Sequence, residues 1–185
     1  ADLEAIVIGA SAGAVEALST LLPTLKQGFR LPIIIVVHLP PDRRSAMAEL
    51  FRARCALDVR ETEDKESIVP GTIYFAPPDY HLLVEAGRTF ALSYDAPVRF
   101  SRPSIDVLFE SAADAYGPKV LGIVLTGANE DGARGLRAII EAGGLGIVQT
   151  PSTAFARAMP EAALGMNPSA TPMTLEAMAA YLEEI

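Results

Sequence analysis

Three runs of branched apolar residues, each followed by a turn, constrain the fold of this chain more than any other feature. They span residues 5–8, 33–37 and 120–125, and a stretch with helical spacing follows each turn. Continuous Val, Ile and Leu without alternation is typical of strands buried on both faces, as in parallel sheets. A fourth run at 145–149 follows the Gly143–Gly144 break and is predicted to join the same sheet. Strand, turn and helix repeated in this order predict a doubly wound α/β fold, with a mostly parallel sheet and helices on both faces.

Apolar residues at helical spacing fill the intervals between these strands. The clearest stripe lies within residues 105–116, where Pro103–Ser104 supplies a start signal and Gly117–Pro118 a stop. Weaker stripes lie at 15–25, 47–51 and 136–140. Each is predicted to form a helix that packs on the sheet.

The middle of the chain has a different pattern. Short strand-like pieces at 72–75, 82–84 and 89–92 are separated by turn residues. They predict an antiparallel hairpin or meander inserted at the edge of the sheet. Because neither a low-complexity linker nor a fixed-period repeat interrupts the chain, residues 1–185 are predicted to form a single domain.

Composition excludes several classes of protein. Half of the 185 residues are hydrophobic and 21% are charged, which excludes a disordered chain. With 15 Lys and Arg against 23 Asp and Glu, the net charge of −8 argues against a nucleic-acid partner. No apolar stretch approaches the length of a membrane span, and Asp2 and Glu4 do not fit a secretory signal. One cysteine, Cys55, excludes an internal disulfide, so we expect a cytoplasmic protein without membrane insertion.

Three residue types that together perform acyl transfer follow three of the buried runs. Ser11 follows the first run, His38 the second and Asp131 the third. In doubly wound sheets, ligands bind outside the carboxyl ends of the strands. A hydroxyl, an imidazole and a carboxylate at one such edge are the nucleophile, the general base and the acid that orients the base.

Ser11 lies in the pattern Gly9-x-Ser11-x-Gly13 between a predicted strand and a predicted helix. This is the nucleophile-elbow pattern, in which glycines permit a tight turn that projects the hydroxyl, and the helix N-terminus suits a developing oxyanion. For these five residues alone, a glycine-rich turn of a phosphate-binding domain is the more common explanation. Neither a Walker A sequence nor G-x-G-x-x-G supports that explanation further.

The base and the acid each have rivals. The chain has one other histidine, His81, which lies in the predicted meander, where a hydrogen-bonded structural role is expected. Asp131 alone is explained as a helix N-cap, Glu130 competes for the orienting role, and Asn129 could serve as a donor. The chain order Ser, His, Asp differs from that of the α/β-hydrolases and argues against an ordinary esterase fold. With two distant histidines and one cysteine, no metal site and no cofactor are expected.

Five ordered segments carry a resemblance to a known family. They are Ile8-Gly9-Ala10-Ser11-Ala12-Gly13, Val37-His38-Leu39-Pro40-Pro41, the stretch from Pro70 to His81, Arg102-Pro103-Ser104-Ile105-Asp106-Val107-Leu108-Phe109, and Leu125-Thr126-Gly127 with Asp131-Gly132-Ala133. Together they resemble the catalytic domain of CheB, the chemotaxis-receptor protein-glutamate methylesterase and glutamine deamidase. The resemblance covers nearly the whole chain.

The resemblance implies an activity and a set of roles. Ser11 would be the nucleophile, His38 the general base and Asp131 its partner, in the hydrolysis of γ-glutamyl methyl esters with release of methanol and in the deamidation of some glutamines. The substrate would be the methylated, helical cytoplasmic domain of chemotaxis receptors. The backbone groups that hold the oxyanion and position the substrate would be those of Ala12, Gly13, Ala128 and Asn129.

Three positions depart from the family pattern. Ala12 stands where the family usually has Thr, Ala14 where it has a second Gly, and Ala128 where it has Met. They motivate an alternative, a catalytically impaired module of the same fold that binds a receptor or a sensor kinase. A small-molecule esterase that uses the same triad is a third reading.

Partners and regulation follow from the resemblance as well. A receiver domain precedes the catalytic domain in many family members, and 185 residues are too few for both, so we expect either an excised catalytic domain or a relative without a receiver domain. A sensor kinase or a separate receiver domain could then be a partner. Four arginines could line the mouth of the site and contact an acidic receptor surface: Arg43, Arg44, Arg99 and Arg102. For Arg43 and Arg44, a solvated surface is an equally good explanation.

Overall fold

A parallel β-sheet with helices on both faces forms the body of the protein. The structure is a computed structural model that describes residues 2–39 and 46–185. The sheet has the strand order β3-β4-β2-β1-β7-β8-β9, and every neighbouring pair is parallel. These strands are β1 (Ala5–Ala10), β2 (Ile33–Val37), β3 (Asp58–Glu61), β4 (Thr72–Phe75), β7 (Val120–Val124), β8 (Leu145–Gln149) and β9 (Thr171–Met173). The predicted fold class is therefore confirmed.

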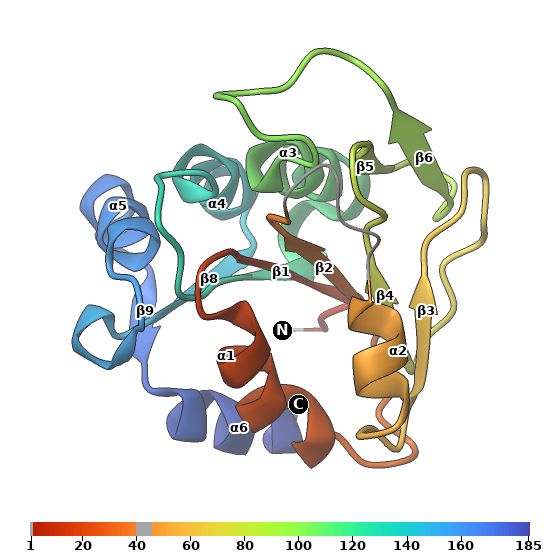
Figure 1. The fold of residues 1–185 in the computed structure, drawn as a ribbon, viewed down its shortest axis with the longest axis horizontal. Coiled ribbons are helices and arrows are strands. Elements are labelled where there is room, and N and C mark those ends of the chain that lie inside the picture. The colour runs from red at the N-terminus through yellow and green to blue at the C-terminus, as the bar shows by residue number, and fades with distance from the viewer. Residues whose placement is uncertain (1, 40–45) are drawn as a thin grey trace.

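The helices cover the two faces of the sheet in two groups, as Figure 1 shows for α3 and α4 above the sheet and α1 and α6 below it. One core holds side chains of α1, α2 and α6, and the other holds side chains of α3, α4 and α5. The helices are α1 (Ala14–Leu21), α2 (Met47–Arg52), α3 (Ile105–Tyr116), α4 (Ala133–Glu141), α5 (Ala158–Met166) and α6 (Leu175–Glu184). Short 3₁₀ helices lie at Leu22–Thr24, Gly117–Lys119 and Pro151–Thr153. None of the helices in the described ranges has the length and apolar composition that a bilayer span requires.

The central strands are buried because their sequences are apolar on both faces. Every residue of β1, β2 and β7 is buried, as the unbroken runs predict. The helix start predicted at Ser104 is also confirmed, since its hydroxyl accepts a hydrogen bond from the N–H of Val107.

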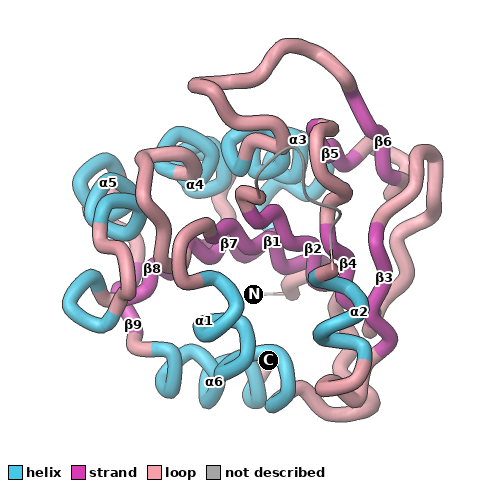
Figure 2. Tube along the Cα trace, viewed as in Figure 1, coloured by secondary structure: helices cyan, strands magenta, loops and turns pink. Residues whose placement is uncertain are grey.

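The predicted antiparallel meander is correct for one pair of strands and wrong for the third. β5 (His81–Val84) and β6 (Phe90–Ser93) form an antiparallel hairpin outside the main sheet. The piece at Thr72–Phe75 is instead β4, which lies inside the parallel sheet between β2 and β3. Figure 2 shows the hairpin set apart from the central strands. The apolar sequence of β4 suits either a hairpin or a parallel sheet, so it does not determine with which strands β4 pairs.

Candidate active site

Backbone hydrogen bonds bring the three strand-end segments together. β1 lies between β2 and β7, so the residues that follow these strands share one edge. The N–H of Ser11 donates to Thr126 O (3.0 Å), and the N–H of His38 donates to Ala10 O (3.1 Å). Both bonds continue the ladder past the ends of the strands and fix where the side chains of Ser11 and His38 begin.

His38 is bonded at both ring nitrogens. Its Nε2 lies 2.7 Å from Asp131 Oδ2, and its Nδ1 lies 3.3 Å from Asn129 Nδ2. The amide orientation of Asn129 follows from its own Oδ1, which accepts from the N–H of Asp131 (3.0 Å). Because an ionised carboxylate can only accept, Nε2 carries the hydrogen and Nδ1 presents the lone pair. Nδ1 is thus the nitrogen that can take a proton.

Asp131 is buried, with 3% of its side chain exposed, and it lies at the N-terminus of α3. Besides His38, its carboxylate accepts from the N–H of Ile105 (2.6 Å), the N–H of Asp106 (2.9 Å) and the hydroxyl of Ser104 (3.2 Å). Burial acts to raise the pKa of Asp131, but the hydrogen bonds from His38 and from the two N–H groups outweigh it and hold the pKa below its usual range. The group is therefore a carboxylate at neutral pH.

Ser11 lies on the turn between β1 and α1. Gly13 follows it with φ 87°, a left-handed conformation, and a Cβ there would lie 2.7 Å from Cβ of Phe155. Ser11 Oγ accepts a hydrogen bond from the N–H of Ala128 (3.0 Å). Within the described residues no hydrogen bond joins Ser11 Oγ to His38, although both residues line the same hollow.

That hollow has a volume of about 310 Å³ and mostly apolar walls. Its lining residues are Ser11, Gly13, Ala14, Val15, Glu16, Val37, His38, Leu39, Met47 and Phe155. His38 also lines a second hollow of about 250 Å³, where Asn129, Asp79 and Arg102 contribute to the wall. The imidazole therefore contributes to two depressions, and Ser11 lines the first of them.

The N–H groups predicted to hold an oxyanion differ in how they are used. Within the described part of the chain, the N–H groups of Ala12 and Gly13 have no hydrogen-bond acceptor. The N–H of Ala128 points at Ser11 Oγ, and Asn129 contributes its side chain to His38. The N–H of Gly127 is taken by Ala156 O (3.1 Å) and is not available. A carbonyl oxygen beside Ser11 could thus accept a hydrogen bond from the N–H of Ala128. The N–H of Ala12, in the same turn as Ser11, is without an acceptor in the described part of the chain.

A sequence profile of the CheB methylesterase family matches residues 6–182. The chain belongs to this family. The crystal structure of the CheB methylesterase catalytic domain of Thermotoga maritima superposes with a TM-score of 0.94 at 29% identity, over 100% of this chain and 99% of that one. The family resemblance and the prediction of a methylesterase-type hydrolase are thereby confirmed.

Two relatives differ in how much of their length this chain covers. A protein of Leptospira interrogans, provisionally named a protein-glutamate methylesterase/protein-glutamine glutaminase, is 47% identical over 96% of this chain and 92% of its own length. The protein-glutamate methylesterase/protein-glutamine glutaminase of a Nocardioides species is 42% identical over 85% of this chain but only 43% of its own length. The CheB match therefore corresponds to almost all of one relative and to less than half of the other.

The rivals considered for the CheB site have other roles. His81 is buried, with Nε2 on Ala96 O (3.0 Å) and Nδ1 accepting from the N–H of Ser104 (3.2 Å), so its predicted structural role is confirmed. Glu130 is exposed and pairs with Arg99. Asp131 does not cap the helix that follows it, because Gly132 is the N-cap of α4.

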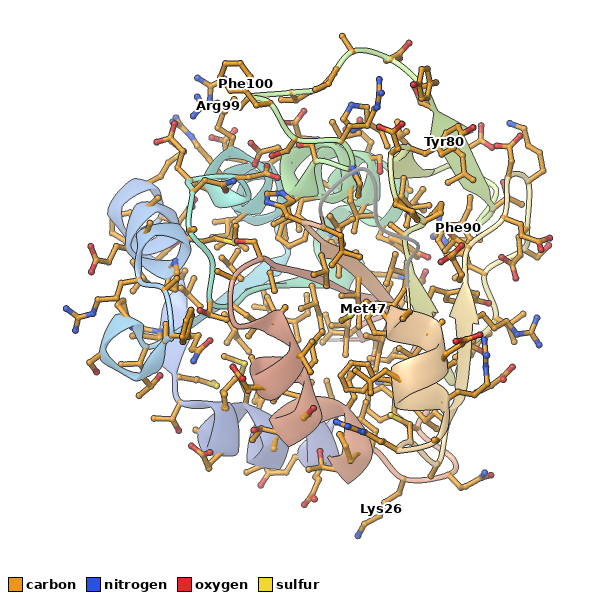
Figure 3. The ribbon with its side chains drawn as sticks, viewed as in Figure 1. Lys26, Met47, Tyr80, Phe90, Arg99 and Phe100 are labelled. Atoms are coloured by element: carbon orange, nitrogen blue, oxygen red, sulfur yellow. The ribbon has the colours of Figure 1, made fainter. Side chains whose placement is uncertain are left out.

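Of the four arginines expected at the mouth, the two that the structure describes, Arg99 and Arg102, are paired within the chain. Arg102 contacts Asp79 (2.9 Å) and lies over the ring of Tyr94. Figure 3 shows Arg99 and Phe100 on the long loop between β6 and α3. Arg43 and Arg44 lie outside the described residues.

The sequence did not predict the role of Thr126, which joins the turn at Ala12 to the segment at Ala156. The Thr126 hydroxyl lies 2.9 Å from Ala12 O and accepts from the N–H of Ala156 (2.9 Å). The buried amide of Gln149 accepts from the N–H of Thr126 (3.0 Å). The family segment Leu125-Thr126-Gly127 was the available signal, but it carried no role for the threonine. Among the described residues, no cluster of three or more His, Cys, Asp or Glu could hold a metal ion.

Proposed function

We propose that this protein hydrolyses γ-glutamyl methyl esters through a Ser11-His38-Asp131 triad. The observation that carries the proposal is the imidazole of His38, which is held by Asp131 at 2.7 Å through Nε2 and turns its basic Nδ1 away from the carboxylate. Ser11 opens into a hollow that His38 also lines. The activity in the names of the Nocardioides and Leptospira relatives supports the choice of ester.

In the first half of the reaction Ser11 Oγ attacks the ester carbonyl and its proton passes to His38 Nδ1. The oxyanion accepts from the N–H of Ala128 and of Ala12. The C–O bond to the methoxy group then breaks, and the proton on His38 leaves with methanol. An acyl-enzyme on Ser11 remains.

In the second half His38 takes a proton from water, and the hydroxide formed attacks the acyl-enzyme. The bond to Ser11 Oγ breaks, the serine recovers its proton from His38, and the glutamic acid side chain is released and loses its own proton to solvent. A glutamine substrate follows the same steps with ammonia as the leaving group. Deamidation is therefore a second activity of the same site.

Two of the departures from the family pattern leave this chemistry intact. Ala128 and Ala12 act through their backbone N–H groups, which every residue except proline supplies. The impaired binding module is therefore not favoured by any contact in the site. We propose the methylated cytoplasmic domain of a chemotaxis receptor as the substrate; a sensor kinase and a separate receiver domain stay predictions.

The test is methanol release from a methylated receptor cytoplasmic domain by the purified protein. Ser11→Ala is expected to lower kcat by at least about 10³-fold, because the triad acts as a unit. Ser169→Ala, at an exposed serine remote from the hollow, is the matched control and should retain wild-type activity. Activity of Ser11→Ala equal to wild type would exclude the serine mechanism. Hydrolysis of p-nitrophenyl acetate as efficient as that of the receptor would favour a small-molecule esterase.

A further inference from the structure

Two buried carboxylates accept hydrogen bonds across the N-termini of α3 and α4, each from the helix that the other carboxylate belongs to or precedes. Asp131, just before α4, accepts from the first N–H groups of α3, those of Ile105 and Asp106. Asp106, in the first turn of α3, accepts in return at the start of α4, from Gly132 N–H (2.9 Å) and Gly135 N–H (2.8 Å). Each helix thus supplies the anion that the N-terminus of the other favours.

The two carboxylates and the helix N-termini that they bond are tightly packed, so neither carboxylate has much room to move. Asp106 is buried, with 4% of the residue exposed, and Asp106 Oδ1 accepts both of the α4 bonds. A Cβ on Gly135 would lie 2.5 Å from Cβ of Phe109 and 3.0 Å from Cα of Asp106, so α3 and α4 are in close contact at this point. The turn that carries Asp131 is therefore held from the side of α3.

The pKa values of the two carboxyl groups are shifted in opposite directions. Burial and then the charge of Asp131 raise the pKa of Asp106 to about 6, against hydrogen bonds from Gly135 and Gly132 that lower it. Burial also acts on Asp131, but His38 and the α3 N–H groups keep its pKa low. Asp106 is thus mostly ionised at pH 7 and mostly protonated at pH 5.

Few other charges in the described ranges, 2–39 and 46–185, face this pair. His38, after β2, reaches it through Asp131, and His81 on β5 bonds the N–H of Ser104 instead. Arg134 and Arg137 lie exposed on α4. Strands β1 and β7, which also pack on α3, contain no titratable residue. Within residues 2–39 and 46–185, Asp131 is the charged group that shifts the pKa of Asp106, and His38 is the group bonded to Asp131 that can become a cation.

We propose that Asp106 is a positioning residue of the active site, whose carboxylate holds the Asp131 turn and whose negative charge supports the protonated form of His38 during the reaction. This inference rests on the proposed function, in which His38 becomes an imidazolium as Ser11 attacks. A negative charge behind Asp131 stabilises that imidazolium in the transition state. Protonation of Asp106 removes the charge but leaves an oxygen that can still accept from α4.

The variant that separates the charge from the hydrogen bonds is Asp106→Asn, which retains a side-chain oxygen for Gly132 and Gly135. The measurement is kcat/KM of wild type divided by that of the variant, from pH 5 to pH 8.5. We expect a ratio of about fivefold above pH 7 that falls toward one near pH 5. The midpoint of that change should lie near 6. Asp114→Asn, at an exposed position of the same helix, should give a ratio of one throughout.

The other outcomes overturn the proposal. A ratio of one at every pH would mean that the charge has no effect, and a large ratio that does not change with pH would mean that Asp106 acts only through packing and hydrogen bonds. A ¹³C NMR titration of the Asp106 carboxyl in the wild-type protein needs neither activity nor the variant, and its midpoint gives the pH at which the ratio should change; a ratio that changes at a different pH would contradict the proposal. Failure of the proposed function would instead appear as an active Ser11→Ala.

Discussion

Asp131 and Ser11 lie at the same edge of the sheet, but the structure holds them in different ways. The carboxylate of Asp131 is buried and accepts four hydrogen bonds, from Ile105, Asp106, Ser104 and His38. Ser11 Oγ is half-buried and accepts one, from the N–H of Ala128. The part of the site around Asp131, the acid side, is therefore held in place without substrate. The part around Ser11, the nucleophile side, has room for a substrate.

This difference follows from the chemistry each side performs. A buried carboxylate without partners is costly, so Asp131 requires its hydrogen bonds for stability as well as for orientation. A serine hydroxyl is neutral until it reacts, and in the proposed mechanism its proton has to reach His38 Nδ1, which lies 3.3 Å from Asn129 Nδ2. That mechanism requires substrate binding to align Ser11 with His38 on the nucleophile side, while the acid side stays as it is.

The largest effect that tests this comparison is expected for Asp131→Asn. The amide would place an NH₂ group where one oxygen now accepts, so the hydrogen on His38 Nε2 loses its ionic acceptor. We expect kcat/KM to fall by about 10³–10⁴-fold. The N–H of Ile105, which donates to the same oxygen as His38, would also lose its acceptor, and this should lower the free energy of unfolding by about 1–3 kcal/mol. Methanol-release kinetics and denaturant unfolding measure the two quantities.

Glu130→Gln is the control for that variant, because Glu130 is the neighbouring carboxylate and it is exposed. It should leave both quantities near their wild-type values. If Ser11→Ala lowered the free energy of unfolding as much as Asp131→Asn does, the acid side would be no more firmly held than the nucleophile side, and the comparison would be wrong.

A smaller effect is expected for Gly127→Ala, which adds one methyl group beside the nucleophile. Its Cβ would lie 2.7 Å from Ser11 Oγ and 2.6 Å from Sδ of Met159, which is fully buried. One of these side chains has to move. We expect kcat to fall by about 10²-fold, because a displacement of about 1 Å misaligns the attack. Overpacking should also lower the free energy of unfolding by about 1–3 kcal/mol.

Gly87→Ala is the matched control for the added methyl group, since nothing lies within 4 Å of a Cβ at that position. It should leave turnover unchanged. If Gly127→Ala retained more than half of the wild-type kcat, the nucleophile side would be loose enough to accommodate a methyl group, and alignment of Ser11 would matter less than the geometry indicates.

How far the sequence predicts this site depends on the range of the contacts involved. Ser11 and His38 directly follow apolar strands, and parallel strands end at one edge, so local patterns were enough to bring them together with Asp131. The bonds from Asp106 to α4 span 26 and 29 residues. An aspartate in the first turn of a helix is explained locally by the helix dipole, which hides such a partner.

The same reason accounts for the errors in the fold. The sequence did not predict β3, because three of its four residues are charged and exposed and only Val59 is buried. β4 was recognised as a strand but assigned to the hairpin, because its partners β2 and β3 are set by sheet pairing and not by its own four residues. Short strands at the margins of a sheet are defined by their neighbours, whereas β1, β2 and β7 are defined by their own apolar runs.

The smallest effect concerns the wall of the hollow on the nucleophile side. Phe155 lines it together with Ser11, and 78% of this residue is exposed, so its ring is accessible to a substrate. If substrate completes this side of the site, Phe155→Ala should raise KM for methylated receptor by about fivefold, the loss of about 1 kcal/mol of apolar contact, and leave kcat unchanged. Val69→Ala truncates an exposed apolar residue that precedes β4, toward the amino ends of the strands, and should change neither constant. An unchanged KM in Phe155→Ala would mean that the hollow does not contact substrate. A fall in kcat with KM unchanged would mean that Phe155 holds Ser11 in place, so the nucleophile side would be preorganised like the acid side.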